Sequence, residues 1–231
     1  MIGTRGNLRI LVAEFAAMFV LAAAILFVAA GTIAWPVGWA FLVLSFGLSA
    51  AMYGWLVRHD PGLVAERMTG LGRLEQSAWE NAFIALTCVF FLAWLVLMPL
   101  DAVRFQWSHV PAVVQALGAV LLVGAFWLHF LTFRENSYLS PAIRIQSERG
   151  QKVIDTGPYR YVRHPMYTSL LGLTAGAALM LGSWLGLVAV PVLAIGLAAR
   201  AMLEESMLAR ELPGYDEYMV RVRYRFVPYV W

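Results

Sequence analysis

The sequence predicts an all-α integral membrane protein with about six transmembrane helices, and three observations support this fold class. Of its 231 residues, 61% are hydrophobic and only 13% are charged, with a mean hydropathy of +0.71. A soluble domain is nearer half apolar and a quarter charged. The apolar residues gather in runs of about 20, the length that a helix needs to cross a bilayer. The basic residues lie at the boundaries of these runs.

Six apolar runs are candidate spans, and the predicted spans are 9–33, 35–57, 79–100, 111–133, 165–182 and 184–203. Arg5 and Arg9 precede the first run, as in a signal peptide. This run is longer than a typical signal core and contains Glu14, so we interpret it as a span. Only Gly182 and Ser183 separate the last two spans, which predicts a tight antiparallel hairpin near the C-terminus.

The basic residues predict the orientation of the spans. With six spans and both termini in the cytoplasm, Arg104 is the one basic residue outside and the other 16 of the 17 lie inside. Cytoplasmic loops carry an excess of Lys and Arg, so this orientation is strongly preferred. The large polar segments 58–78, 134–164 and 204–231 then all lie at the inner surface, where we expect any polar chemistry.

Composition also excludes some classes of function. The basic residues form no contiguous face, which argues against nucleic-acid binding. Cys88 is the single cysteine, so the chain has no intrachain disulfide, and no Cys/His cluster has metal-site spacing. Lys152 is the single lysine beside 16 arginines, a bias that favours a bacterial source and hence a bacterial inner membrane. Nothing in the sequence predicts an oligomeric state.

Segment 58–78 is predicted to form a short amphipathic helix at the membrane surface after Pro61, interrupted by Gly70 and Gly72. Within the fourth span, we expect His129 to be a neutral buried histidine with a structural partner, because intramembrane polar groups usually face the bundle. For the same reason we expect Glu14 to face the bundle.

A first polar cluster directly precedes the fifth predicted span, in the stretch GPYRYVRHPMY. Pro165 suits the first turn of a helix, where its missing N–H costs nothing, and His164 before it is biased away from helical dihedrals. Arg163, His164 and free N–H groups are then presented at a helix N-terminus, which favours an anionic group such as a carboxylate. Tyr159 and Tyr167 can stack on a flat ring or form hydrogen bonds. The alternative is an interfacial anchor of Arg and Tyr side chains.

A second cluster lies at the inner end of the sixth span, where Glu204 and Glu205 are adjacent. Neighbouring residues on a helix point about 100° apart, so both carboxylates cannot face one ligand group. We expect one to contact a ligand and the other to pair with Arg200 or Arg163. The alternative is a pair of solvated charges at the membrane boundary.

The segment 215–228 is too aromatic to be left in water, and we expect it to pack as a lid over a polar pocket. Its polar and aromatic side chains fall on about one helical stripe, formed by Tyr215, Tyr218, Arg221, Tyr224 and Arg225. One of Arg221, Arg223 and Arg225 should turn inward to an anionic group, and we favour Arg225. The alternative is that these arginines lie on anionic lipid headgroups.

Together these residues resemble the isoprenylcysteine carboxyl methyltransferase family and its relatives among the phospholipid N-methyltransferases. The shared marks are the Arg163-His164-Pro165-x-Tyr167 motif, the pair Glu204-Glu205 one helical hairpin later, and a Tyr/Arg-rich tail through Pro228. The resemblance covers roughly residues 111–231. It implies a single membrane domain over 1–231, with N-terminal spans and an interfacial segment in 1–110 and a methyltransferase-like catalytic core in 111–231.

The resemblance further implies an enzyme that uses S-adenosylmethionine in a cytoplasmic pocket and methylates a lipophilic acceptor, such as a carboxylate or an amine, that enters from the bilayer. It assigns cofactor binding to Tyr159, His164, Pro165, Tyr167, Glu204 and Glu205, and catalysis to Arg163 and Arg225. Two alternatives stay open at this point. One is a relative of the sterol reductases, which share a His-Pro-x-Tyr-like element but use NADPH, and the other is a non-enzymatic membrane module.

Overall fold

The computed structural model describes the backbone of residues 4–69 and 78–231 and the side chains of 12–68 and 82–231. Within these residues the chain is helical and contains no strand, which confirms the predicted all-α class. The α-helices are α1 (Thr4–Ala30), α2 (Pro36–His59), α3 (Pro61–Thr69), α4 (Ala78–Pro99), α5 (Ala112–Glu135), α6 (Pro165–Met180), α7 (Ala189–Glu211) and α8 (Tyr215–Arg221). Short 3₁₀ or π turns join several of them, namely η2 (Leu100–Arg104), η3 (Ser147–Arg149), η4 (Gly157–Arg160) and η5 (Leu185–Val188).

Five helical segments of the described chain are long and apolar enough to cross a membrane: Val12–Ala30, Pro36–His59, Ala82–Arg104, Ala112–Glu135 and Leu185–Glu211. They correspond to five of the six predicted spans. The predicted span 165–182 contains α6, which has only 16 residues and is shorter than the roughly 20 that a bilayer requires. A count of six full-length spans is therefore not confirmed.

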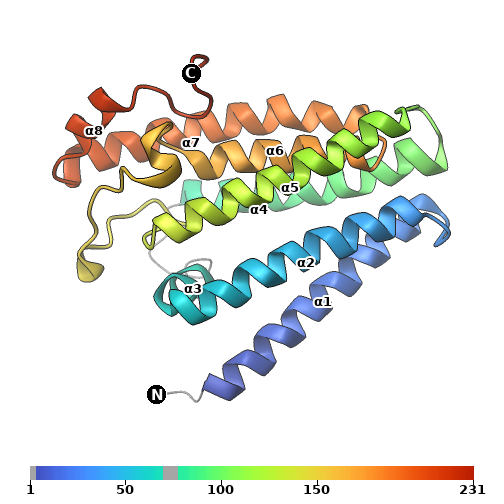
Figure 1. Ribbon diagram of the computed structural model, residues 1–231, viewed down its shortest axis with the longest axis horizontal. Coiled ribbons are helices and arrows are strands. Elements are labelled where there is room, and N and C mark those ends of the chain that lie inside the picture. Colours follow the sequence, from blue (N-terminus) through green and yellow to red (C-terminus); the bar gives the residue numbers. More distant parts are fainter. Residues whose placement is uncertain (1–3, 70–77) are drawn as a thin grey trace.

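The short helix α6 lies inside the bundle, beside α5 and α7 (Figure 1). Half of its 16 residues are buried, whereas at most 33% of the apolar window of any of the five long segments is buried. Because α6 is surrounded largely by protein rather than lipid, its length need not match the thickness of the bilayer. Gly182, with φ +84°, turns the chain soon after the helix ends.

Glycines let α5 and α6 approach each other closely. A Cβ atom at Gly176 of α6 would lie 2.6 Å from the backbone nitrogen of Leu122, and one at Gly118 of α5 would lie 2.5 Å from that of Met180. Such contacts of small residues are the usual way for apolar helices to pack when lipid surrounds them. This packing fixes the position of α6, and with it the polar cluster at its N-terminus.

The predicted C-terminal hairpin is present, since α7 runs back alongside α6 (Figure 1). Its turn is longer than expected because η5 follows Gly182 and Ser183 before α7 begins. Buried Asp101 holds this turn in place, with its Oδ2 accepting from the hydroxyls of Ser183 at 2.5 Å and Ser108 at 2.7 Å.

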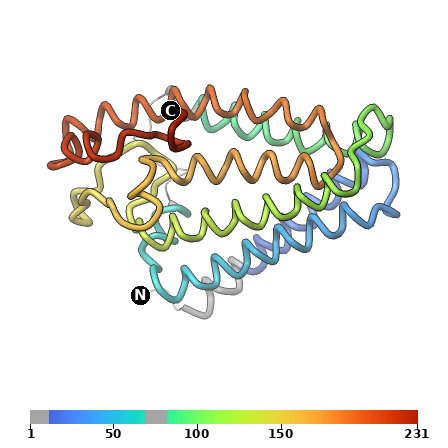
Figure 2. The backbone as a smooth tube through the Cα atoms, turned by 45° about the horizontal axis from the view of Figure 1, so that its top comes forward, coloured from blue at the N-terminus to red at the C-terminus, as the bar shows by residue number. Residues whose placement is uncertain are grey.

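The polar segments gather at one end of the bundle, as the sequence predicted. Figures 1 and 2 place α3, the segment that joins α5 to α6, and α8 with the following tail at this end. The helix that follows Pro61 is confirmed as α3, whereas the predicted interruption at Gly70 and Gly72 lies outside the described residues. The expectation for Glu14 is wrong, because this residue is exposed rather than facing the bundle.

Candidate functional site

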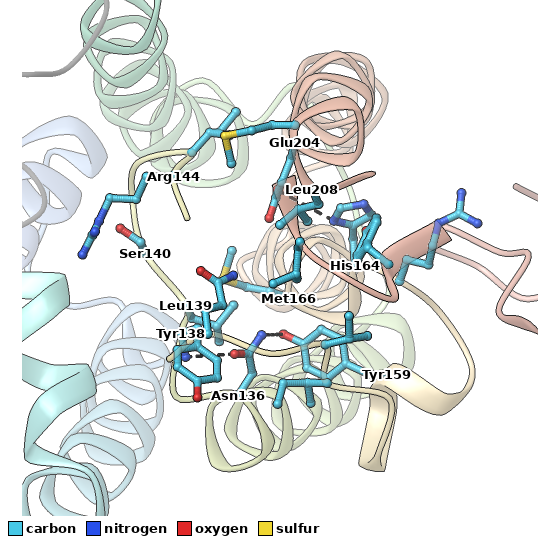
Figure 3. A pocket seen from close by; sticks show the side chains of 18 of the residues that line it. Asn136, Tyr138, Leu139, Ser140, Arg144, Tyr159, His164, Met166, Glu204 and Leu208 are labelled. Carbon is cyan, nitrogen blue, oxygen red and sulfur yellow. Dashed lines mark hydrogen bonds and ion pairs between the residues drawn. The ribbon is translucent and has the colours of Figure 1, made fainter. Parts of the chain in front are cut away.

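A cavity, partly open to the exterior, lies at the polar end of the bundle, and Figure 3 shows side chains that line it. The lining comes from the ends of α5 and α7, the segment before α6, the first turn of α6, and α8. Five of the predicted site residues line it: Tyr159, Arg163, His164, Tyr167 and Glu204. The remaining three, Pro165, Glu205 and Arg225, lie outside the lining.

The beginning of α6 places two of these side chains on one wall of the cavity. His164 caps the helix with non-helical dihedrals of φ −124° and ψ 63°, and Pro165 occupies the first helical position, as predicted. The rings of His164 and Tyr167 stack, with their centroids 5.2 Å apart and their planes 6° from parallel. Tyr167 donates its hydroxyl to Oε2 of Glu204 at 2.8 Å. His164 and Tyr167 therefore lie side by side on one face of the start of α6.

The two adjacent glutamates have different surroundings. Glu205 is buried, with its Oε1 2.7 Å from Nε of Arg163 and 3.0 Å from Nε2 of His164. Its Oε2 accepts from Nε of Arg225 at 2.9 Å. Glu204 instead lines the cavity and points toward His164, whose Nδ1 lies 3.9 Å from Oε2 (Figure 3). The expectation that one glutamate pairs with an arginine is confirmed for Glu205 and Arg163.

The C-terminal tail folds back beside the start of α6 (Figure 2). The backbone N–H groups of Arg163 and His164 donate to the carbonyls of Tyr224 and Arg225, both at 2.9 Å. Thr168 adds a hydroxyl hydrogen bond of 2.6 Å to the carbonyl of Phe226. These two N–H groups are therefore not free to bind an anion, because the tail satisfies them as buried donors require.

The tail does not form the predicted helical stripe, because α8 ends at Arg221 and the residues after it form bends and turns rather than a helix. Tyr215 and Tyr218 of α8 face inward and line the cavity. Arg221 points outward and pairs with Asp155 at 2.8 Å. Arg225 is the arginine that turns inward, as favoured from the sequence, but its anionic partner is Glu205 of the protein itself.

Buried phenols form the wall between the tail and the cavity. Tyr218 donates to the backbone carbonyl of Tyr159 at 2.8 Å, and the hydroxyl of Tyr159 accepts from Nδ2 of Asn136 at 2.9 Å. Burial raises the pKa of the Tyr159 and Tyr218 phenols well above the ordinary value. Both side chains are therefore neutral and offer the cavity an aromatic surface with hydrogen-bonding hydroxyls.

The segment before α6 contributes residues to the lining that sequence reasoning did not assign, among them Asn136, Tyr138, Arg144, Gln151 and Lys152. Arg144 donates from Nε and Nη2 to the two oxygens of Glu66 in α3, at 3.1 and 2.8 Å. These hydrogen bonds raise the pKa of Arg144. The N-terminal part of the chain thus supports one wall of the cavity. The composition of the segment signalled its importance, whereas nothing in the sequence singled out Glu66.

His129 lies outside the cavity lining, as its structural interpretation predicts. Its Nδ1 is 2.7 Å from Oγ of Ser169, and its ring packs against Phe133. Within the described part of the chain, no group of three or more His, Cys, Asp or Glu side chains could hold a metal ion.

Comparison with known proteins agrees with the motifs. Residues 113–213, which include α5, α6, α7 and the intervening segment, match the sequence model of the phospholipid methyltransferase family. No curated protein matches the chain significantly. The match confirms the resemblance drawn from the Arg163-His164-Pro165-x-Tyr167 motif and the two glutamates. The matched residues 113–213 carry most of the site, and this part of the chain is similar to the phospholipid methyltransferase family.

Proposed function

We propose that the chain is a methyltransferase that binds S-adenosylmethionine in this cavity and methylates a lipophilic acceptor that enters from the bilayer. The observation that carries the proposal is the cavity itself, which lies at the end of a bundle of apolar helices and has most of its lining residues within the matched segment 113–213. Its position would let a polar cofactor enter from water and an apolar acceptor enter from lipid. By the distribution of Lys and Arg, we propose that this end of the bundle faces the cytoplasm.

The lining residues fit the chemical groups of S-adenosylmethionine. The cofactor has a flat purine, ribose hydroxyls, an ammonium group, a carboxylate and a cationic sulfur. The neutral aromatic surfaces of Tyr159, Tyr215 and Tyr218 suit the purine, and Glu204 could accept from the ribose hydroxyls or the ammonium group. When bound, this cofactor supplies a methyl group that a nucleophile can attack.

The protein's own contribution would be to position the reactants and to exclude water. The His164–Tyr167 stack fixes the orientation of Glu204 through the Tyr167 hydroxyl. Apolar side chains such as Met166, Met207 and Leu208 form the remaining wall. Holding two reactants in line can lower the barrier by about 7–11 kcal/mol in favourable cases. Exclusion of water would also remove a competing nucleophile.

The predicted roles of the arginines are refined by their partners. Arg163 lines the cavity and remains our proposed catalytic arginine, although its guanidinium is bonded to Glu205. Arg225 lies outside the lining, so we propose that it acts through Glu205 and the tail as a positioning residue. Glu205 and Pro165 would likewise shape the site rather than contact the cofactor, leaving Tyr159, His164, Tyr167 and Glu204 as the proposed contacts.

Calorimetric titration of the detergent-purified protein tests this proposal. We expect binding of S-adenosylmethionine and none of NADPH. Glu204→Gln should weaken binding by roughly 1.5–3 kcal/mol, the range for hydrogen bonds to charged groups. Glu211→Gln is the matched control, because Glu211 is exposed on the same helix and outside the cavity lining. Binding of NADPH, or equal binding of S-adenosylmethionine by both variants, would contradict the assignment.

A further inference from the structure

Arg200 is a buried cation whose hydrogen-bond partners are neutral. It lies on α7, one turn before Glu204, and its relative exposure is 8%. Its Nε donates to the Tyr167 hydroxyl at 3.2 Å, and its Nη2 donates to the carbonyl of Pro141. The guanidinium carbon lies 5.1 Å from the centre of the Phe83 ring. Arg200 also lines the cavity.

The other arginines of the cavity lining are paired with carboxylates. Arg163 is bonded to Glu205, and Arg144 is bonded to Glu66 and Glu148. Among the described residues, no Asp or Glu oxygen lies within 4.0 Å of the Arg200 guanidinium. A buried charge without a partner costs several kcal/mol. Arg200 therefore lacks the carboxylate partner that Arg144 and Arg163 each have.

The charged residues that line the cavity also favour a ligand with an acidic group. Once the paired Arg144 and Arg163 are set aside, the charged lining residues are Arg200, Lys152 and Glu204. Glu204 reaches Arg200 only through the Tyr167 hydroxyl, which donates to the carboxylate and accepts from the guanidinium. One carboxylate thus faces two cations, and a ligand that carried an acidic group would balance them.

We infer that Arg200 binds a carboxylate or phosphate oxygen of the ligand in the cavity. A guanidinium suits this role, because its planar fork offers paired donors to such groups. In the described structure Nη1 makes no hydrogen bond, so it is available as a donor. This inference rests on the proposed function. It assigns the ligand's acidic group to Arg200 because Arg163 and Arg225 are paired with Glu205, and it leaves the proposed catalytic role of Arg163 unchanged.

The acidic group could come from the cofactor, which carries a carboxylate, or from the acceptor. A titration with matched ligands separates the two sources. S-Adenosylhomocysteine and its decarboxylated analogue differ only in the carboxylate, and oleate and monoolein provide an anionic and a neutral amphiphile. Each is titrated calorimetrically into the wild type, Arg200→Gln, Arg200→Lys and the control Arg210→Gln. Arg210 is exposed on the same helix and outside the cavity lining.

If the cofactor supplies the anion, Arg200→Gln should weaken S-adenosylhomocysteine roughly tenfold to a hundredfold. It should leave the decarboxylated analogue unchanged. If the acceptor supplies it, S-adenosylhomocysteine should bind equally well and oleate should lose affinity relative to monoolein. Arg200→Lys keeps the charge but lacks the fork, so its loss should be intermediate, and it serves as the second variant if Arg200→Gln does not fold.

Unchanged affinity of all four ligands in folded Arg200→Gln or Arg200→Lys would overturn the inference. Failure of the wild type to bind S-adenosylhomocysteine would instead refute the proposed function. In that case the comparison of oleate with monoolein still decides whether Arg200 binds an anion.

Discussion

Two buried carboxylates lie at opposite ends of the bundle and are held in different ways. At the cavity end, Glu205 is bonded to Arg163, His164 and Arg225, which come from the segment before α6 and from the tail. At the other end, Oδ2 of Asp101 accepts hydrogen bonds from the hydroxyls of Ser108 and Ser183 and from the N–H of Leu185. Its Oδ1 is buried without a hydrogen-bond partner among the described residues.

The difference indicates what each end does. Arg163 from the segment before α6 and Arg225 from the tail both form salt bridges with Glu205, so this carboxylate holds the tail and the start of α6 together beside the cavity. Serine hydroxyls meet on Asp101, so this carboxylate closes short turns and involves no salt bridge in the described structure. We therefore expect changes at Glu205 to alter both stability and ligand binding, and changes at Asp101 to alter stability alone.

The largest effect should follow from Glu205→Gln. This change leaves the guanidinium groups of Arg163 and Arg225 near a neutral amide, and loss of one partner of a buried ion pair typically costs about 3–5 kcal/mol. We expect a large fall in thermal stability in detergent, together with weaker binding of S-adenosylmethionine. Glu211→Gln, on the exposed face of α7, is the control. A variant with unchanged stability and binding would show that Glu205 does not join the tail to the site.

A smaller effect is expected from Arg225→Lys. Lysine keeps the charge but cannot reproduce the placement of a guanidinium that bonds Glu205 at 2.9 Å and lies 4.7 Å from the centre of the Trp231 ring. Loss of this hydrogen bond should cost roughly 1.5–3 kcal/mol, with methyl transfer falling more than cofactor affinity. Arg221→Lys should change neither, because that side chain is exposed beside Asp155. Equal rates in the two variants would favour lipid contact over positioning.

The parts of the site that were predicted from the sequence are local. His164, Pro165 and Tyr167 lie within one turn of each other, so dihedral preference and helical spacing suffice to place them. The adjacency of Glu204 and Glu205 likewise forces different directions, and this predicted one ligand-facing and one paired carboxylate. Five of the six spans predicted from the apolar runs correspond to helical segments of spanning length, because hydropathy depends on composition alone.

The parts that were missed depend on contacts between distant residues. The pairing of Glu66 with Arg144 joins α3 to the cavity wall across 78 positions in sequence, and no local pattern encodes it. The helical stripe of the tail fails because α8 ends at Arg221, after which the chain pairs with the N–H groups of Arg163 and His164. The sequence also could not show which arginine of the cavity lining would lack a carboxylate partner. In the structure that arginine is Arg200.

The smallest effect should follow from Asp101→Asn, which tests the other side of the comparison. The carbonyl oxygen of Asn can accept from Ser108 and Ser183 as Oδ2 does, and its amide takes the place of an oxygen that has no hydrogen-bond partner among the described residues. Removal of a buried charge that has no cationic partner offsets the cost of leaving the Asn N–H groups without an acceptor, so we expect stability to change by no more than about 1 kcal/mol. Binding of S-adenosylmethionine should be unaltered.

Asp101→Ala is the informative companion to this variant. It leaves both serine hydroxyls and the N–H of Leu185 without their acceptor, and unsatisfied buried donors cost about 1–3 kcal/mol each. Thermal unfolding should therefore rank the wild type and Asp101→Asn together, with Asp101→Ala well below them. If Asn were as destabilising as Ala, the negative charge itself would be needed at this end of the bundle. Both carboxylates would then be needed in their charged form, and Glu205 and Asp101 would differ only in which groups donate hydrogen bonds to them.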